Sequence, residues 1–428
     1  MRFADAVAEL ERRQPEHMPE PDLDRMRALA TLLAEPQLTY QTIHVTGTNG
    51  KTTTARLAAS IACAHGLTTG LFTSPHLESV TERFEICGDP MAGETFGEEF
   101  EHLLACLRTV DEQVGPVTYF EALTALAYLS FADAPVGLGV FEVGMGGTWD
   151  ATNLVSGDVA VLCPIGLDHP QLGSTIAEVA GEKAGIIKQG KVAVAREQTD
   201  EALGVIERRC EEQIATLLLE GRDWEAADLT PAVGGQALAI RGLHATYDDI
   251  LLPIYGEHAA HSAAAAVVAV EALLERALDP DAVRLALGAA TSPGRLEVAA
   301  RRPLVVLDGA HNPTAARALA QALPDTFTWD RLHLVLGVFA DKDLEGIVAP
   351  LAPLADAGYA TAVDSVRARP PREVANAMAV HDIATETFPS VPDALEAAAR
   401  AASDGDLILV TGSLYTVADA RRALLEDS

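Results

Sequence analysis

The sequence predicts an α/β fold built around a doubly wound parallel sheet. Three observations lead to this prediction: short apolar strands alternate with helical segments, several strands are apolar throughout, and a glycine-rich loop joins one strand to one helix. Strands that are apolar throughout are typical of parallel sheets, because helices cover both faces. The expected strands are residues 42–45, 137–143, 159–165, 192–195, 304–308, 333–338 and 407–412.

The chain begins with an amphipathic helix and divides into two domains. The opening MRFADAVAELERR places Asp5, Glu9 and Glu11 within an apolar pattern, which predicts a helix and not a signal peptide. The strand–helix pattern restarts after TSPGR (291–295), whose Ser-Pro-Gly is a turn signal. We therefore expect a large N-terminal domain at 1–292 and a smaller Rossmann-like domain at 296–428. Residues 222–252 are less periodic and yield no structural prediction.

Composition and charge exclude several classes of protein. Among 428 residues, 31 are Lys or Arg and 62 are Asp or Glu, so the formal net charge is -31. This balance disfavours binding to nucleic acid or to an anionic membrane surface, because a basic face is missing. Five cysteines are scattered without a C-x-x-C pair, which argues against a disulfide framework and a zinc site. We expect a cytoplasmic enzyme that acts as a monomer.

The segment TIHVTGTNGKTTTARLAASIA (42–62) carries the strongest motif. A strand leads into a G-x-x-G-K-T loop, and a helix follows; Val45 stands where the strict phosphate loop has glycine. Such a loop binds a nucleotide triphosphate, because backbone N–H groups and the helix N-terminus surround the phosphates. Lys51 is expected to reach the β- and γ-phosphates and Thr52 to bind Mg²⁺. The residues predicted to bind ATP here are Gly47, Thr48, Asn49, Gly50, Lys51, Thr52 and Thr53.

Further polar residues follow the neighbouring strands. Glu142 ends a strand, which is typical of a Mg²⁺ ligand beside a phosphate loop, although an ion pair at the strand edge is the alternative. Asp150 either closes an Asx turn or contacts substrate. Asp168 and His169 follow another strand, and His169 is a candidate metal ligand. Lys183 by itself is either a phosphate clamp or a solvated helix residue, because an ammonium group repels Mg²⁺.

Taken together, the motifs resemble dihydrofolate synthase/folylpolyglutamate synthase, a branch of the Mur ligase superfamily. The matching segments run in the family's order from about residue 43 to 416: HVTGTNGKTTT, FTSPHL, ERFEICG, TYFEALT, FEVGMGGTWDATN, IGLDH, EKAGI, SPGRLEV, DGAHNP and TGSLY. FTSPHL, ERF and TYFE are particular to the folate branch. The resemblance implies a Mur-ligase-like fold, with a phosphate-loop domain followed by a smaller α/β domain.

The resemblance also implies a role for individual residues. Metal ligands fall on Ser74, Glu142 and His169, with Thr52 as a possible addition. Lys183 falls on a carbamylated lysine, whose anionic carbamate binds a second Mg²⁺. Arg295 and Asp308 contact ATP, and His311 and Asn312 line the same cleft. The implied substrate-binding residues are Arg83, Thr118, Phe120, Asp150, Ala151, His311, Asn312 and Ser413. Phe120 would stack on a pterin unless it is a helix core residue, and Arg83 pairs with a substrate carboxylate or forms a surface ion pair.

The implied reaction joins L-glutamate to dihydropteroate or to reduced folates, at the expense of ATP and with Mg²⁺, through an acyl phosphate. Three departures from the family bear on substrate choice and nucleotide affinity: Thr148, Ala259 and Ser262 replace an arginine and two amides. The alternatives are a related ligase that acts on a non-folate acid and a nucleotide-gated binding module or ATPase.

Overall fold

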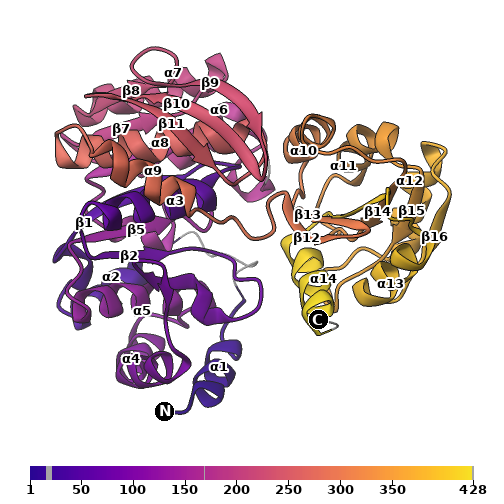
Figure 1. Ribbon diagram of the computed structural model, residues 1–428. Helices are drawn as coiled ribbons and strands as arrows, with labels where there is room; N and C mark the ends of the chain where they lie inside the picture. The colour runs from indigo at the N-terminus through magenta and orange to yellow at the C-terminus, as the bar shows by residue number, and fades with distance from the viewer. Residues whose placement is uncertain (16–21, 168, 427–428) are drawn as a thin grey trace. The chain divides into compact units, whose positions relative to one another are not determined.

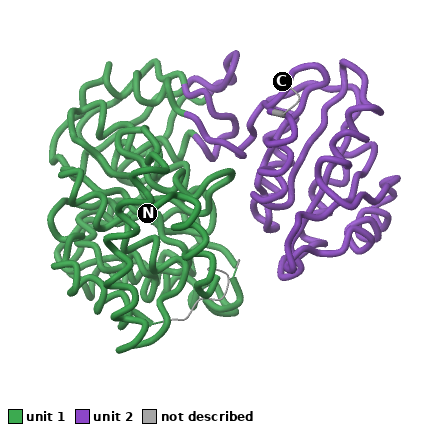
Figure 2. Tube along the Cα trace, turned by 90° about the horizontal axis from the view of Figure 1, so that it is seen from below, with its two compact units in different colours: residues 1–229, 238–251, 260–290 green, residues 230–237, 252–259, 291–428 purple. Residues whose placement is uncertain are grey.

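The computed structural model describes residues 1–15, 22–167 and 169–426, and these form two compact units (Figure 2). Unit 1 comprises residues 1–229, 238–251 and 260–290, and unit 2 comprises residues 230–237, 252–259 and 291–428. The predicted domains differ from these units in two short segments, 230–237 and 252–259. The prediction assigns both segments to the N-terminal domain, whereas they belong to unit 2. The boundary at 292–296 stays a prediction.

Unit 1 contains an eight-stranded sheet in the order β4-β3-β2-β5-β1-β6-β7-β8 (Figure 1). Six of these strands run parallel, and β3 and β4 extend one edge in antiparallel fashion. The strands are β1 (Gln41–Thr46), β2 (Thr69–Phe72), β3 (Phe84–Ile86), β4 (Asp89–Pro90), β5 (Leu138–Glu142), β6 (Val159–Leu162), β7 (Val192–Ala195) and β8 (Thr216–Leu219). The doubly wound α/β prediction is confirmed.

Helices cover both faces of this sheet. Because parallel crossovers are right-handed, the path from β1 to β2 and the path from β6 to β7 place their helices on opposite faces. α3 packs on β1, β2 and β5, whereas α5 packs on β2 from the side of the Phe141 ring. The helices are α1 (Phe3–Glu11), α2 (Asp24–Leu32), α3 (Lys51–Ala64), α4 (Gly93–Gln113), α5 (Tyr119–Asp133), α6 (Ile176–Ala184), α7 (Asp200–Gln213), α8 (Glu257–Leu274) and α9 (Pro280–Gly288).

The weakly periodic stretch 222–252 forms a separate three-stranded sheet, with the order β11-β10-β9. Its strands are β9 (Glu225–Ala232), β10 (Gly235–Arg241) and β11 (Thr246–Leu252). Every residue of β9 is exposed or only partly buried, which explains why neither helical nor strand periodicity stands out in its sequence. The Ala-rich α8 follows and is buried over much of its length.

Unit 2 is a second α/β layer structure around the sheet β12-β13-β17-β14-β15-β16 (Figure 1). β12 is antiparallel to β13, and the other strands are parallel. Its elements are β12 (Glu297–Arg301), β13 (Leu304–Leu307), α10 (Pro313–Thr326), β14 (Leu332–Leu336), α11 (Leu344–Leu351), β15 (Ala357–Ala360), α12 (Pro371–Val380), β16 (Thr385–Thr387), α13 (Val391–Ala401), β17 (Leu407–Thr411) and α14 (Leu414–Glu426).

Every strand expected from the apolar runs is present in the eight-stranded or the six-stranded sheet. None of the helices in the described part of the chain combines the length and the apolar character that crossing a lipid bilayer requires.

The cysteine prediction was wrong for one pair. Cys63, in the last turn of α3, and Cys87, in the turn after β3, form a disulfide across a Cα–Cα distance of 5.6 Å. The two residues are 24 positions apart, and only the pairing of β2 with β3 brings the turn beside the helix end. Cys106, Cys163 and Cys210 are free thiols.

We expect the disulfide to be detectable by counting thiols. Denatured protein kept without reductant should react at the three free cysteines, and reduced protein at all five. The Cys63→Ser variant is the control, because it should leave Cys87 reactive without reductant. Five reactive thiols in the unreduced wild type would show that the pair is not joined in solution.

Candidate active site

The loop between β1 and α3 approaches the end of β6 so closely that its first glycine cannot be replaced. Gly47 has a φ of +143°, and a Cβ atom on it would lie 2.5 Å from Cys163 Cβ. Gly50 begins α3 as its N-cap with a φ of +87°. Both glycines therefore serve the backbone path that turns N–H groups towards the loop centre.

Hydrogen bonds tie this loop to the segment that follows β6. The Thr48 N–H donates to the Pro164 carbonyl at 2.9 Å, and the Thr48 hydroxyl donates to the Gly166 carbonyl at 2.9 Å. The Lys51 ammonium folds back to the carbonyls of Gly47 at 3.0 Å and Thr48 at 3.3 Å. The loop is thus held in shape before any anion arrives.

Glu142 lies at the centre of the oxygen-rich side of the loop. Its register partner on β1 is Val45, so both side chains face α3. The Thr52 hydroxyl donates to Glu142 Oε1 at 2.8 Å, and the Ser74 N–H donates to Oε2 at 3.1 Å. Glu142 is 2% exposed, and the choice between a Mg²⁺ ligand and an ion pair at the strand edge stays a prediction. A carboxylate beside a hydroxyl is a donor set that fits Mg²⁺.

Lys183 reaches the same loop from α6. The side chain is buried, and its ammonium donates to the Gly47 carbonyl at 2.8 Å. The alternative of a solvated helix residue is therefore wrong. Lys51 and Lys183 share one acceptor oxygen, so two positive groups lie together where a nucleotide's phosphates are expected.

His169 is half-buried and begins the short helix Pro170–Leu172, beyond the carboxyl end of β6. Asp168, its predicted companion, lies outside the described residues. Among the residues that the structure does describe, no group of three or more His, Cys, Asp or Glu side chains could hold a metal ion. The metal-ligand set that includes His169 stays a prediction.

The turn after Glu142 packs between an aromatic ring and α6. A Cβ on Gly144 would lie 2.6 Å from Phe120 Cζ, and a Cβ on Gly147 would lie 2.7 Å from the Glu182 carbonyl oxygen. Phe120, in the first turn of α5, is only half-buried, and its ring centroid is 5.9 Å from that of Phe72. It is therefore a partly exposed ring at the margin of the core, which suits stacking on a flat ligand.

The start of α5 is fixed by two charged residues. Thr118 caps the helix, because its hydroxyl oxygen accepts the Glu121 N–H. Buried Arg25 donates to both carboxylate oxygens of Glu121, at 3.0 Å to Oε2 and 2.9 Å to Oε1. The Thr118 hydroxyl oxygen thus has a structural role beside its predicted contact with substrate.

Arg83 is also buried, so the alternative of a surface ion pair is wrong. The side chain is 1% exposed, and its Nε donates to His76 Nδ1 at 2.9 Å. Its guanidinium carbon lies 5.6 Å from the centre of the Tyr119 ring. Binding of a substrate carboxylate by Arg83 stays a prediction.

Asp150 closes a turn, in agreement with the Asx alternative. Its carboxylate accepts the N–H groups of Met145 and Thr152 at 2.9 and 3.0 Å. The Thr152 hydroxyl contacts both Asp150 and the ring of His44, which lies at 2.8 Å. Burial raises the pKa of Asp150 and lowers that of His44 well below its usual value. The neighbouring Ala151 is buried, and a substrate contact by either residue of this turn stays a prediction.

The predicted residues of unit 2 lie beyond the carboxyl ends of β13 and β17. Asp308 accepts the N–H groups of Leu296 and Ala310 at 2.9 Å. Burial raises the pKa of Asp308, and the positive charge of Arg295 opposes that rise. Asn312 caps α10 and His311 Nδ1 lies 2.8 Å from the Gly309 carbonyl. Ser413 accepts the Thr416 N–H at 3.0 Å.

Sequence reasoning missed Arg196, which directly follows β7. Its Nη1 donates to the Ser262 hydroxyl at 3.3 Å, and its Nε lies 3.6 Å from Glu220. The guanidinium stands beside the loop, since Nη1 is 3.5 Å from the position that a Cβ on Gly50 would take. Its position directly after a parallel strand was the feature of the sequence that could have indicated a place at the ligand-binding edge of the sheet.

Comparison with known proteins identifies the family of this chain. The model of the Mur ligase middle domain matches residues 45–270, and that of the Mur ligase glutamate ligase domain matches residues 294–414. The chain belongs to the Mur ligase family. A curated relative, the dihydrofolate synthase/folylpolyglutamate synthase of Mycobacterium tuberculosis, is 40% identical, with 96% of this chain and 92% of the relative covered. The family resemblance found in the sequence is therefore confirmed.

Two solved structures of the family are similar throughout. Folylpolyglutamate synthase of Mycobacterium tuberculosis complexed with ADP is 38% identical with a TM-score of 0.94, covering 99% of this chain and 98% of that one. Escherichia coli FolC in complex with DHPP and ADP is 29% identical with a TM-score of 0.89, covering 100% and 98%. The chain is thus a member of the ligases that are named for folate synthesis.

We expect Gly47→Ala to lose nucleotide binding while the protein stays folded. The added methyl cannot fit against Cys163, so the loop must shift and its N–H groups leave their positions. The dissociation constant for ADP, measured by calorimetry, should rise about tenfold or more, which corresponds to roughly 1.4 kcal/mol. Gly204→Ala in α7 is the control, because its Cβ would enter open space and should leave the affinity unchanged. Equal ADP affinity in the two variants would contradict the role of this loop.

Proposed function

We propose that this protein is an ATP-dependent ligase that joins L-glutamate to the carboxylate of dihydropteroate or of a reduced folate, with release of ADP and phosphate. The observation that supports it most directly is the convergence of Lys51, Lys183, Thr52 and Glu142 on one strand-to-helix loop in a chain of this family. We further propose that the enzyme works in the cytoplasm as a monomer.

Charge neutralisation is the main catalytic task. An amide forms only if the acid is activated, so its carboxylate oxygen must attack the γ-phosphorus of ATP, although both groups are anions. Lys51, the loop N–H groups and the N-terminus of α3 would stabilise the charge that develops on the transferred phosphoryl group. Mg²⁺ held by Thr52 and Glu142, with Ser74 and His169 as further proposed ligands, would supply additional neutralisation. The glutamate amine then attacks the acyl carbon and phosphate departs.

The acid substrate is proposed to bind near the start of α5. The half-exposed Phe120 ring offers a face for a pterin, and Arg83 offers a positive charge close by. The relative from Escherichia coli was solved with DHPP and ADP, which supports a pterin acid as the substrate class. Thr118, Asp150 and Ala151 would shape this pocket. In unit 2, Arg295 and Asp308 are proposed to hold the nucleotide, and His311, Asn312 and Ser413 the reacting groups.

Lys183 is proposed to carry a carbamate. Its ammonium would lose one proton, and the neutral amine would then add to CO₂ and release a second proton, which replaces a cation by an anion. The position beside Lys51 supports this, because two ammonium groups at one carbonyl repel each other, whereas a carbamate and an ammonium attract. An anion there also suits a second Mg²⁺.

The reaction is tested by measuring ADP release with a panel of acids and by identifying the product by mass spectrometry. We expect release that requires both L-glutamate and a pterin acid, and a mass gain of one glutamyl residue. UDP-muramyl peptides in the panel test the non-folate alternative, and release without glutamate would favour a simple ATPase.

Glu142→Gln should lower the rate by about 100-fold or more by removing a metal-binding charge, whereas Glu396→Gln, at an exposed ion pair, should not.

Lys183→Ala should be inactive and should regain part of its activity with a short carboxylate such as acetate. The buried space left by the side chain lies beside the Gly47 carbonyl, where a small anion would replace the carbamate. The rate is measured against acetate concentration, with Lys191→Ala, at a half-exposed ion pair, as the control. Full activity of Lys183→Ala without acetate would remove the carbamate proposal.

A further inference from the structure

The strand that leads into the phosphate loop also carries a polar side chain on its other face. Side chains alternate along a strand, so His44 points away from the face to which Val45 and Glu142 point. Its register partner on β5 is Phe141, whose ring centroid lies 5.5 Å from that of Phe131 in α5. His44 is fully buried on this side of the sheet. The proposed mechanism assigns no task to it.

Hydrogen bonds join His44 to the turn that follows β5. Its Nε2 lies 2.8 Å from the Thr152 hydroxyl, and that hydroxyl also contacts Asp150 Oδ1. Asp150 accepts the Thr152 N–H through Oδ1 at 3.0 Å and the Met145 N–H through Oδ2 at 2.9 Å. We call His44, Thr152 and Asp150 the His44 relay. It leads from β1 to the start of the turn that comes directly after Glu142.

Chemistry assigns the protons of the His44 relay. A threonine hydroxyl has one proton to donate, and the Asp150 carboxylate, at which two backbone N–H groups are directed, is an acceptor. Thr152 therefore donates to Asp150 and accepts from His44, so Nε2 carries the imidazole proton. Burial lowers the pKa of His44 well below its usual value, which keeps the ring neutral at neutral pH. Nδ1 is then an acceptor, and within the described residues this buried atom has no hydrogen-bond partner.

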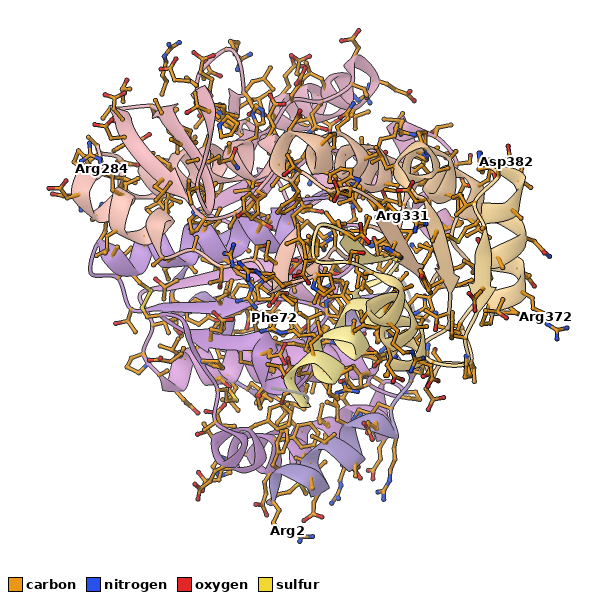
Figure 3. All side chains as sticks on the ribbon, turned by 45° about the vertical axis from the view of Figure 1, so that its right-hand side comes forward. Arg2, Phe72, Arg284, Arg331, Arg372 and Asp382 are labelled. Carbon is orange, nitrogen blue, oxygen red and sulfur yellow. A yellow bond between two sulfur atoms is a disulfide. The ribbon has the colours of Figure 1, made fainter. Side chains whose placement is uncertain are left out.

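The turn that the relay holds packs against the ring that is proposed to stack on the acid substrate. A Cβ on Gly144 would lie 2.6 Å from Phe120 Cζ. The Phe72 ring, which Figure 3 shows in the interior of unit 1, lies 5.9 Å from that of Phe120 and 6.2 Å from that of Phe141. Close-packed neighbours cannot absorb a shift. A displaced turn would therefore move the Phe120 ring.

The same turn is held from α5 as well. The Tyr128 hydroxyl donates to the Ala151 carbonyl at 2.9 Å, and both residues are buried. Tyr128 and Phe120 belong to the same helix. The turn is thus fastened to the sheet through His44 and to the helix through Tyr128, and the two attachments together set its distance from the Phe120 ring.

We propose that His44 is a positioning residue for the acid substrate, because it fixes through Thr152 and Asp150 the turn that packs on Phe120. His44 itself touches no reacting group. The phosphate loop begins at the end of the same strand, so one rigid element sets the places of both the nucleotide and the acid. Such mutual placement is what brings a carboxylate into line with a phosphorus atom. This inference rests on the proposed ligation of a pterin acid.

The test measures steady-state kinetics of full-length variants with dihydropteroate, ATP and L-glutamate. His44→Leu fills the space but removes the donor, and Thr152→Val removes the hydroxyl with little change of shape. Each should raise KM for dihydropteroate by about tenfold, the usual effect of leaving a buried hydrogen-bonding group without its partner. KM for ATP and for glutamate should change less than about threefold. A parallel rise of all three KM values would contradict a role directed at the acid.

Two amides at position 44 separate the relay from simple filling of space. His44→Gln places an N–H near the position of Nε2 and should bring KM for dihydropteroate to within about threefold of wild type, whereas the shorter His44→Asn should not. Equal KM values for the two amides would contradict the relay.

The double variant His44→Leu/Thr152→Val should raise KM no more than the worse single variant, because the same relay is broken twice. Increases that multiply would show that the two residues act separately, which also contradicts the relay.

Thr42→Val is the matched control. Thr42 is fully buried on the same face of β1, and its hydroxyl oxygen accepts the Gly157 N–H at 2.7 Å. The variant loses a similar hydrogen bond outside the relay, so KM for dihydropteroate should stay within twofold of wild type. Equal KM values for Thr42→Val and Thr152→Val would overturn the inference, even if His44→Leu fails to fold. The proposed function is decided separately, because it fails only if the wild type forms no glutamyl product.

Discussion

The arrangement of the site depends on one crowded carbonyl. Gly47 can have no side chain, because the end of β6 fills the space beside it, and its carbonyl oxygen accepts from both Lys51 and Lys183. Both ammonium groups lie within 3.0 Å of that oxygen, so two positive charges meet at one point of the loop. A phosphate group that binds beside this oxygen is attracted by both charges. The geometry of one glycine thus sets the preference of the loop for negative ligands.

The same logic explains how an acidic chain handles acidic substrates. ATP, glutamate and a pterin acid are all anions, and a chain of net charge -31 repels them at long range. Salt shortens this repulsion to about 10 Å, so cations inside a pocket decide what binds there. Lys51 and Lys183 at the loop, Arg83 beside Tyr119 and Arg196 beside Gly50 are such local cations, and all four lie at the carboxyl side of the unit 1 sheet or on the elements that cover it.

The sequence predicted those features of the structure that depend on residues close to one another in the chain. Apolar runs predicted the central strands, because a buried parallel strand leaves a continuous signature. The short β3 and β4 at the sheet edge have too few residues for such a pattern. The Cys63–Cys87 disulfide and the burial of Arg83 depend on which segments fold together, and no spacing rule reveals that. Glu142 and Thr52 were predicted because a strand end and a loop have fixed places in this fold.

Residue roles were harder to predict where one side chain serves two purposes. Thr118, Asn312 and Ser413 each cap a helix through a side-chain oxygen. Capping is worth about 1 kcal/mol, and a helix N-terminus also favours an anionic ligand, so the same atom can support both the fold and the ligand. Replacing Ser413 by alanine would therefore change stability and affinity together.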